Sequence, residues 1–365
     1  MQTDLPYILA LSFQKGIGDF TARKIIQFFG SAEAAWTCKP KDLMQISGIG
    51  QQISKDYNKK KYLDLAFNEI EYCKNNEINI LTIYDEAYPN LLKECLDAPI
   101  VLFTKGNLEF NQFNNKKISI VGTRKMTNYG KNFITELIEG IAEFDTTIVS
   151  GLAYGCDIEA HSQSLKNKVQ TWSVMGTNFE RIYPASHKKI ANEMLQKGGW
   201  ITEQPSFKAV VPEAFLQRNR IIAGLSDVTI VVESAFKGGS LVTAKFANEY
   251  NREVFALPGK TTDSLSVGCN YLIKSQQAYL IENSKDIIEY FNFDIKKKPN
   301  QLDLFIEFSE EEKIIINYLK NNGKQHIDKM SLDLNLKTYE LMPTLLDLEL
   351  KQVIATLPGK FFDLI

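Results

Sequence analysis

Four short motifs in the chain combine glycine with hydroxyl, amide or guanidinium side chains. They are Val121-Gly122-Thr123-Arg124, Ser150-Gly151, Arg218-Asn219-Arg220 and Gly239-Ser240, the last of which opens a helix-like segment that carries Thr243 and Lys245. Glycine lets a backbone approach a ligand closely, hydroxyls and amides donate hydrogen bonds, and arginine neutralises phosphate. The motifs therefore predict an extended anion site, provided that the fold brings them to one place.

The part of the chain from residue 77 to 290 alternates strand-like and helix-like segments. Strand-like runs stand at 118–121, 147–149, 169–174, 199–202, 228–232 and 253–256, and two more, 79–83 and 100–103, lie in a connector before them. This alternation predicts an α/β fold, an extended Rossmann-like core with a mostly parallel, doubly wound sheet. In such a sheet the loops after the strands gather at one edge, where ligands bind.

Residues 1–76 have a helical pattern with two short glycine turns. Lys15–Gly18 and Ser47–Gly50 each place a hydrophobic residue between two glycines before a helical stretch. Such turns resemble the helix-hairpin-helix (SAM-like) module, in which glycines and a helix N-terminus approach a DNA phosphate. A tight turn in a small bundle without a ligand is an equal alternative, so DNA contact and a scaffold role both stay open.

The residues after the α/β part form two further segments. We expect a linker at 291–307 and a winged-helix-like domain at 308–365, which starts with a capped helix at Ser309 and ends in a hairpin. The expected recognition helix near 337–350 carries acidic side chains and little basic charge, which favours a protein-interaction or autoregulatory role over duplex DNA binding. In the linker, Gln301–Phe305 resembles the peptide that docks on the replication sliding clamp, although simple packing on the core is the favoured alternative.

Composition bounds the kinds of partner that the chain can have. It has 365 residues, of which 44% are hydrophobic and 24% charged, with a formal net charge of -2 and a pI of about 6.1. The near-neutral balance excludes a uniformly basic coat, so any polyanion site must be a local patch. The first residues do not form a signal peptide and no apolar run is long enough to span a bilayer, so we expect a cytoplasmic protein without a membrane contact.

Signatures of cofactor-binding proteins and catalysts are missing. The chain has no G-x-G-x-x-G after its first core strand, no G-x-x-x-x-G-K-[ST] and no G-x-S-x-G, and its five cysteines are scattered without a C-x-x-C pair. Asp157 and His161 stand four residues apart on one expected helix, a spacing that suits a metal or acid-base pair. No further ligand is spaced to complete a metal site, so we interpret the two as bracing the loop before the helix, and we expect no metal and no cofactor.

Several longer runs resemble the DprA/Smf family of DNA-processing proteins. The similarity covers residues 80 to 290, in order and with the expected spacing. The matching runs are Val121-Gly122-Thr123-Arg124, Ser150-Gly151-Leu152-Ala153-x-Gly155-x-Asp157-x-x-Ala160-His161, Tyr183-Pro184, Thr202-Glu203, Phe215-x-x-Arg218-Asn219-Arg220-Ile221-Ile222-Ala223-Gly224-Leu225-Ser226, Gly239-Ser240-Leu241-Val242-Thr243-Ala244, Arg252-x-Val254-Phe255-Ala256-x-Pro258-Gly259 and Gly268-Cys269-Asn270-x-Leu272-Ile273.

The resemblance implies a function and a set of contacts. A member of this family binds single-stranded DNA, protects incoming DNA during natural transformation and loads the recombinase RecA onto it, as a homodimer and in the presence of single-strand-binding protein. It is a binding protein rather than an enzyme. Carried onto this chain, the contacts are Gly122, Thr123, Arg124, Ser150, Gly151, Arg218, Arg220, Gly239, Ser240 and Lys245 for phosphates, and Phe215 and Asn219 for bases.

A second function from another class stays open. Lys237-Gly238-Gly239-Ser240 followed by Thr243 also resembles the phosphate loop of nucleotide-processing hydrolases of the phosphoribohydrolase type. Such an enzyme needs a glutamate to assist the leaving group, and none is evident beside this loop. The binding protein is therefore the leading hypothesis.

Overall fold

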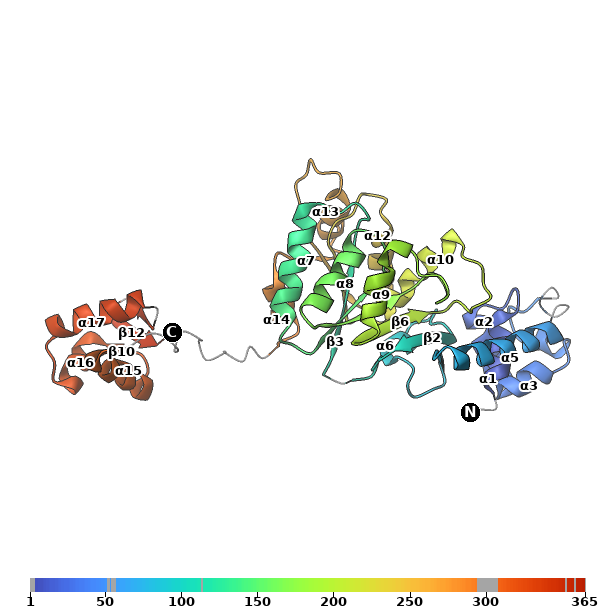
Figure 1. The fold of residues 1–365 in the computed structure, drawn as a ribbon, viewed down its shortest axis with the longest axis horizontal. Helices are drawn as coiled ribbons and strands as arrows, with labels where there is room; N and C mark the ends of the chain where they lie inside the picture. The colour runs from blue at the N-terminus through green and yellow to red at the C-terminus, as the bar shows by residue number, and fades with distance from the viewer. Residues whose placement is uncertain are drawn as a thin grey trace. The chain divides into compact units, whose positions relative to one another are not determined.

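The computed structural model describes residues 4–50, 53, 57–112, 114–293, 308–351, 353–357 and 359–364. It divides into two compact units, Met1–Phe293 and Asp294–Ile365, and each is described by itself (Figure 1). The segment Gln301–Phe305, for which the sequence suggests a sliding-clamp contact, lies outside the described residues.

Helices form the start of the first unit. They are α1 (Leu5–Phe13), α2 (Asp19–Phe29), α3 (Ala32–Thr37), the short 3-10 helix η1 (Asp42–Gln45) and α5 (Lys60–Asn75). Gly16, at φ +87°, forms the turn between α1 and α2, and Ile17 beside it is buried. This positive φ is a conformation that glycine adopts without strain, which explains why the turn contains glycine.

One mixed sheet forms the centre of the first unit. In the described residues it has nine strands in the order β1-β2-β6-β5-β4-β3-β7-β8-β9. Strands β3 to β9 pair in parallel, whereas β1 and β2 are antiparallel. The bounds are β1 Asn79–Thr82, β2 Val101–Gly106, β3 Lys116–Val121, β4 Thr146–Ser150, β5 Gln170–Val174, β6 Gly198–Thr202, β7 Val228–Val231, β8 Glu253–Ala256 and β9 Tyr279–Leu280.

The expected α/β fold with a mostly parallel sheet is confirmed. The structure adds two features that the sequence pattern did not indicate. Strands β1 and β2, expected in a connector, extend the sheet at one edge, and the two-residue strand β9 ends it at the other.

Helices cover both faces of this sheet. Alternate residues of the strands point to opposite faces, so Ile118 and Ile120 of β3 pack in one core cluster and Val121 in another. The cluster of Ile118 includes α7 (Asn128–Ile141), α8 (Cys156–Lys166) and α14, and the cluster of Val121 includes α11, α12 and α13. The remaining helices of this unit are α6 (Asn90–Lys93), η2 (Ala185–His187), α9 (Lys188–Met194), α10 (Pro212–Gln217), α11 (Asn219–Gly224), α12 (Gly239–Glu249), α13 (Val267–Lys274) and α14 (Ser284–Tyr290).

The N-terminal helices and the sheet share a core. Leu9 and Ile25 of the helices belong to the same cluster of buried side chains as Val149 and Trp172 of the sheet. The helical part is therefore packed on the α/β part rather than tethered to it.

The second unit has the element order of a winged helix. It runs α15 (Glu310–Asn322), β10 (Gln325–His326), α16 (Ile327–Leu334), α17 (Thr338–Leu350), β11 (Ile354–Leu357) and β12 (Phe361–Leu364). Ser309 and Glu312 form a capping box at the start of α15, so the helix begins where the sequence indicates. Ile315, Leu345 and Phe362 lie in its small core.

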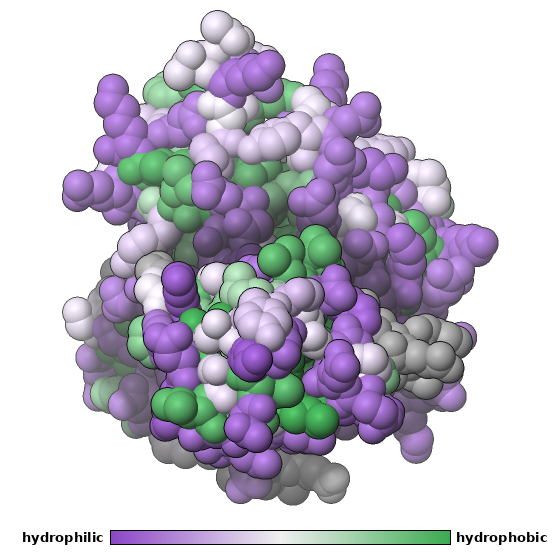
Figure 2. Space-filling view, turned by 90° about the vertical axis from the view of Figure 1, so that its left-hand side faces the viewer, coloured by the Kyte–Doolittle hydropathy of each residue, from purple (hydrophilic) through white to green (hydrophobic). Residues whose placement is uncertain are grey.

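Hydrophilic side chains cover most of the surface seen in Figure 2, and hydrophobic ones lie between them in small groups. Within the described residues, no helix combines the length and the apolar character needed to cross a lipid bilayer.

Candidate functional site

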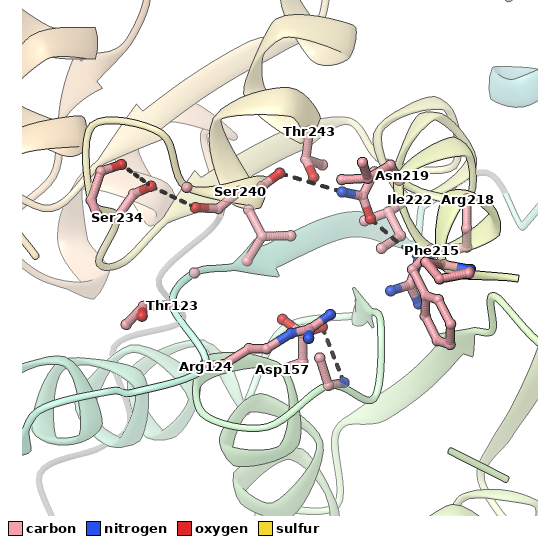
Figure 3. A pocket seen from close by; sticks show the side chains of 18 of the residues that line it. Thr123, Arg124, Asp157, Phe215, Arg218, Asn219, Ile222, Ser234, Ser240 and Thr243 are labelled. Carbon is pink, nitrogen blue, oxygen red and sulfur yellow. Dashed lines mark hydrogen bonds between the residues drawn. The ribbon is translucent and has the colours of Figure 1, made fainter. Parts of the chain in front are cut away.

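A crevice opens where the chain changes direction along the sheet. Strand β3 lies between β4 and β7, and the chain leaves β3 toward one edge of the sheet and β7 toward the other. The loops after these two strands therefore diverge at the carboxyl ends. A cavity of about 670 Å³ lies there, lined by the loops after β3, β4 and β7, by α10–α11 and by the first turn of α12 (Figure 3).

The loop after β3 places Arg124 in this cavity. Gly122, Thr123 and Arg124 all line it, and the Arg124 side chain is exposed and lies beside Asp157 (Figure 3). Gly155, at φ +75°, lets this loop and the loop after β4 come into contact. Any side chain there would clash, because its Cβ atom would stand 2.2 Å from the Thr123 carbonyl oxygen. The loops after β3 and β4 are thus held together by backbone contact, and Arg124 projects from a rigid base.

Asp157 lies in the first turn of α8 at the floor of the cavity. Its Oδ2 atom accepts a hydrogen bond from the Ala153 amide at 3.2 Å, which ties the loop after β4 to the helix. Burial raises the pKa of the Asp157 carboxyl, and the positive charge of Arg218 opposes that rise. Asp157 therefore braces the loop and also adds a titratable negative charge to the cavity.

His161 does not brace the loop, contrary to the prediction from its spacing. Its Nδ1 atom lies 2.7 Å from the Thr171 hydroxyl, and the ring is fully buried between α8 and β5. Burial lowers the pKa of His161 to about 3, so the imidazole is neutral near neutral pH. Because α8 packs this face on the sheet, His161 anchors the helix to β5 while Asp157 holds the loop.

Arg218 lines the cavity, but much of its side chain is already used. It is only 4% exposed, and its Nη1 atom donates to the carbonyl oxygens of Gly151, at 2.7 Å, and Val174. Burial lowers the pKa of Arg218 to about 10, and Asp157 opposes that fall. Arg218 is therefore a fixed positive charge that joins the start of α11 to the loop after β4 and to the end of β5, and its guanidinium is not a free phosphate ligand.

Gly151 and Ser150 also have roles other than those expected. A Cβ atom on Gly151 would lie 2.5 Å from the Arg218 guanidinium, so this glycine makes room for Arg218 rather than for a phosphate. The Ser150 hydroxyl donates to the Ile120 carbonyl at 2.6 Å and is fully buried. Ser150 thus links β4 to β3 and does not face the cavity.

Arg220 lies outside the cavity, which corrects the prediction that it holds a phosphate. Its guanidinium pairs with Glu203 and, at 3.3 Å, with Asp19 of α2, and it donates to the Asp97 carbonyl at 2.7 Å. The Arg220 side chain is only 12% exposed. It therefore joins α11 to the N-terminal helices.

The start of α12 forms the opposite wall. Gly239 and Ser240 line the cavity directly after the N-cap residue Gly238. The first amides of a helix have no intrahelical partner and carry the positive end of its dipole, so this terminus suits an anion. Asn219 holds it in place, since its Nδ2 atom donates to the Gly239 carbonyl at 3.3 Å.

Lys245 lies farther along α12 and does not line the cavity. Its ammonium group is exposed and lies 3.6 Å from the Glu249 carboxylate, one turn away on the same helix. Lys245 is therefore a surface charge near the cavity and not part of its wall.

Aromatic rings stand at the mouth of the cavity. Phe215 packs against Tyr183 with ring centroids 5.4 Å apart, and Tyr183 is 54% exposed. Ser234, after β7, also lines the cavity, and its hydroxyl accepts a hydrogen bond from Ser240 at 2.9 Å. Tyr183 and Ser234 were not among the predicted site residues, although Tyr183-Pro184 belongs to one of the family-like motifs.

Few acidic groups line the cavity in the part of the chain that the structure describes. Among the described residues that line it, Asp157 alone carries a carboxylate. Glu233, which follows β7, is 1% exposed and accepts hydrogen bonds from the Thr127 amide and hydroxyl at the start of α7. In the part of the chain that the structure describes, no group of three His, Cys, Asp or Glu side chains is placed to hold a metal ion. The described lining thus offers donors for an anion and a single carboxylate.

The charge of Asp157 should affect the affinity of the cavity for phosphate, which can be tested. A charged carboxylate opposes phosphate binding, so the affinity for a phosphate chain should rise as the pH falls and this group takes up its proton. Asp157→Asn keeps an oxygen for the Ala153 amide and removes the charge. At a pH where the wild-type carboxyl is charged, we expect the variant to bind a phosphate chain about fivefold more tightly, which equals about 1 kcal/mol, the energy of two unit charges about 4 Å apart in water. Binding titrations over pH check this, and an unchanged pH dependence in the variant would contradict it.

The fold is a Rossmann-like core, and the loops at the carboxyl edge of its sheet form a candidate anion site. Residues 79–292 match the family model of DNA recombination-mediator protein A. The chain belongs to this family.

Relatives and solved structures agree with this assignment. Protein Smf of Synechocystis sp. is 34% identical over 281 residues, which cover 76% of this chain and 70% of that protein. The structure of DNA processing protein A from Streptococcus pneumoniae matches with a TM-score of 0.65 and 30% identity, over 79% of this chain and 98% of that chain. A structure of DNA processing protein A from Helicobacter pylori, described as giving insights into its single-stranded DNA binding mode, matches with a TM-score of 0.53 and 30% identity, over 59% of this chain and 96% of that chain.

Proposed function

We propose that this protein binds single-stranded DNA in the cavity at the carboxyl edge of its sheet and acts there as a recombination mediator. The observation that carries the proposal is the arrangement of the walls. The exposed Arg124 and the start of α12 line one cavity, and Phe215 and Tyr183 stand at its mouth. A positive groove beside aromatic faces is the combination that unpaired nucleic acid requires.

The same arrangement favours a single strand over a duplex. Bases in a duplex are stacked on each other and do not offer their faces to Phe215 or Tyr183, whereas every unpaired base does. The overall net charge of -2 adds no general attraction for polyanions, so binding depends on this local patch. The contacts proposed here are Gly122, Thr123, Arg124, Phe215, Asn219, Gly239 and Ser240, with Arg218 as a fixed positive charge.

The cellular role that we propose is the one implied by the family. The protein protects incoming single strands in the cytoplasm and loads RecA onto them during transformation or recombination, as a homodimer that works on DNA coated with single-strand-binding protein. The loading step needs no catalytic group.

A RecA-loading experiment tests this role. We expect wild-type protein to accelerate RecA filament formation on single strands coated with single-strand-binding protein, and Arg124→Ala to do so at least severalfold more slowly because its DNA contact is weakened. A parallel incubation with nucleoside monophosphates should release no base. Sustained base release that Asp157→Asn abolishes would instead support the nucleotide hydrolase and overturn the mediator proposal.

A further inference from the structure

A second aromatic pair stands beyond the cavity. Phe236, in the loop after β7, and Tyr271, on α13, pack edge to face with ring centroids 5.7 Å apart. The two side chains remain 58% and 46% exposed. Two aromatic rings that are about half exposed do not belong to the buried core. Their apolar faces are accessible to a ligand.

Backbone contacts fix this pair next to the cavity. Ser234 and Ala235, which line the cavity, directly precede Phe236. The Gly268 amide of α13 donates to the Ser234 carbonyl at 2.8 Å, and a Cβ atom on Gly268 would lie 2.7 Å from the same oxygen. The glycine thus lets α13 sit directly on the loop, and the backbone segments that carry the two rings are held together.

The two aromatic pairs come from segments on opposite sides of β3 and β7 along the sheet edge. Phe215 and Tyr183 lie on the β5 side, since Tyr183 follows β5, whereas Phe236 and Tyr271 come from the segments after β7 and β8. The parallel strands lie in the order β5-β4-β3-β7-β8. With about 4.8 Å between neighbouring strands, β5 and β8 are about 19 Å apart. The cavity at β3 and β7 lies between the pairs.

We propose that Phe236 and Tyr271 form a second base-stacking site, which takes the bases of the strand as it leaves the cavity. This inference rests on the proposed single-stranded DNA binding. The single-stranded DNA then runs along the carboxyl edge of the sheet, from the Tyr183 side to the Tyr271 side.

Charge beside the rings favours a nucleic acid as the occupant. Lys237 follows Phe236, and Lys274 stands one helical turn after Tyr271, and both lysines are exposed. Aromatic faces for bases and ammonium groups for phosphates occur together here, as in the cavity. A protein partner would use the rings equally well, but it would not require continuity with a phosphate cavity.

Two oligonucleotides of equal length separate base stacking from phosphate contacts. One carries thymine at every position, and in the other the positions expected at this site are abasic. We expect the double variant Phe236→Leu with Tyr271→Leu to bind the thymine strand about tenfold more weakly than the wild type and the abasic strand equally well, because only a base can stack. Fluorescence of 2-aminopurine at the same positions should be quenched by the wild type and not by the variant.

The control is Phe67→Leu, which removes a ring of similar exposure, 53%, from α5 and should change neither affinity. Equal losses for both strands in the double variant, or no loss for the thymine strand, would overturn the inference. If the wild type binds the thymine strand and Arg124→Ala weakens it while the double variant behaves as the wild type, only the second site fails. If the wild type binds neither strand, the proposed function fails with it.

Discussion

Arg220→Met should lower the free energy of unfolding of the first unit by about 3–5 kcal/mol, the usual cost of removing one partner from a buried ion pair. Arg220 holds the carboxylates of Glu203 and Asp19, and its side chain is 12% exposed. Burial raises the pKa of Glu203 and Arg220 opposes that rise, so the variant leaves an unpaired carboxylate in a dry environment. The α2–α11 contact should loosen first.

Urea unfolding followed by tryptophan fluorescence measures this loss. All three tryptophans of the chain, Trp36, Trp172 and Trp200, lie in the first unit, so the signal reports that unit alone. Lys245→Met is the matched control, since its exposed pair with Glu249 is worth less than about 1 kcal/mol. A stable Arg220→Met protein with weakened DNA binding would show that Arg220 acts at the DNA and not as a structural tie.

Arg124→Ala should have the largest effect on DNA binding. The guanidinium is exposed, lines the cavity and stands on a loop fixed by Gly155, so its removal deletes a charge-assisted phosphate contact without opening the core. Such a contact is worth about 1.5–3 kcal/mol, which is about a ten- to hundredfold loss of affinity. The slope of log affinity against log salt should fall by about 0.7, the value for one phosphate on a single strand.

Titrations of a labelled single strand at several salt concentrations test this expectation, with Lys245→Ala as the exposed-charge control on α12. The variant should unfold at the same urea concentration as the wild type, in contrast to Arg220→Met. An affinity and a salt slope equal to those of the wild type would remove Arg124 from the binding site.

The positions of Arg124 and Gly239-Ser240 could be predicted from the sequence because a general rule places them. Arg124 lies in the loop after β3, and Gly239-Ser240 starts the helix that follows β7; the carboxyl ends of parallel strands meet at one edge. The strand pattern was therefore enough to bring Arg124 and Ser240 into one cavity, as the structure has them.

The different roles of Arg218 and Arg220 could not be predicted in the same way. Residues two apart on a helix do not face the same side. Arg218 therefore points to Gly151 and Val174 at the ends of β4 and β5, and Arg220 points to Asp19 and Glu203. The sequence places both arginines in one motif, and only the partners that the tertiary structure supplies decide which of them can meet a ligand.

The sequence also could not predict where the side chains of Ser150 and His161 point. Ser150 bonds the Ile120 carbonyl on the neighbouring strand, and His161 bonds Thr171 on β5, and neither partner is close in sequence. The second aromatic pair was missed for the same reason. Phe236 and Tyr271 stand 35 residues apart in the printed sequence, and they meet only because Gly268 lets α13 approach the loop after β7.

Hydrogen–deuterium exchange of the full chain, with and without a single-stranded oligonucleotide, tests most directly whether DNA binds at the carboxyl edge of the sheet. The loops after β3 and β4 and the first turn of α12 line the cavity, so their amides should exchange more slowly when DNA is bound. The Gly239 and Ser240 amides should show the strongest protection, because they point to a phosphate at the helix start. Unchanged exchange in these three segments, with protection confined to the glycine turn at Gly16 or to the second unit, would contradict the account.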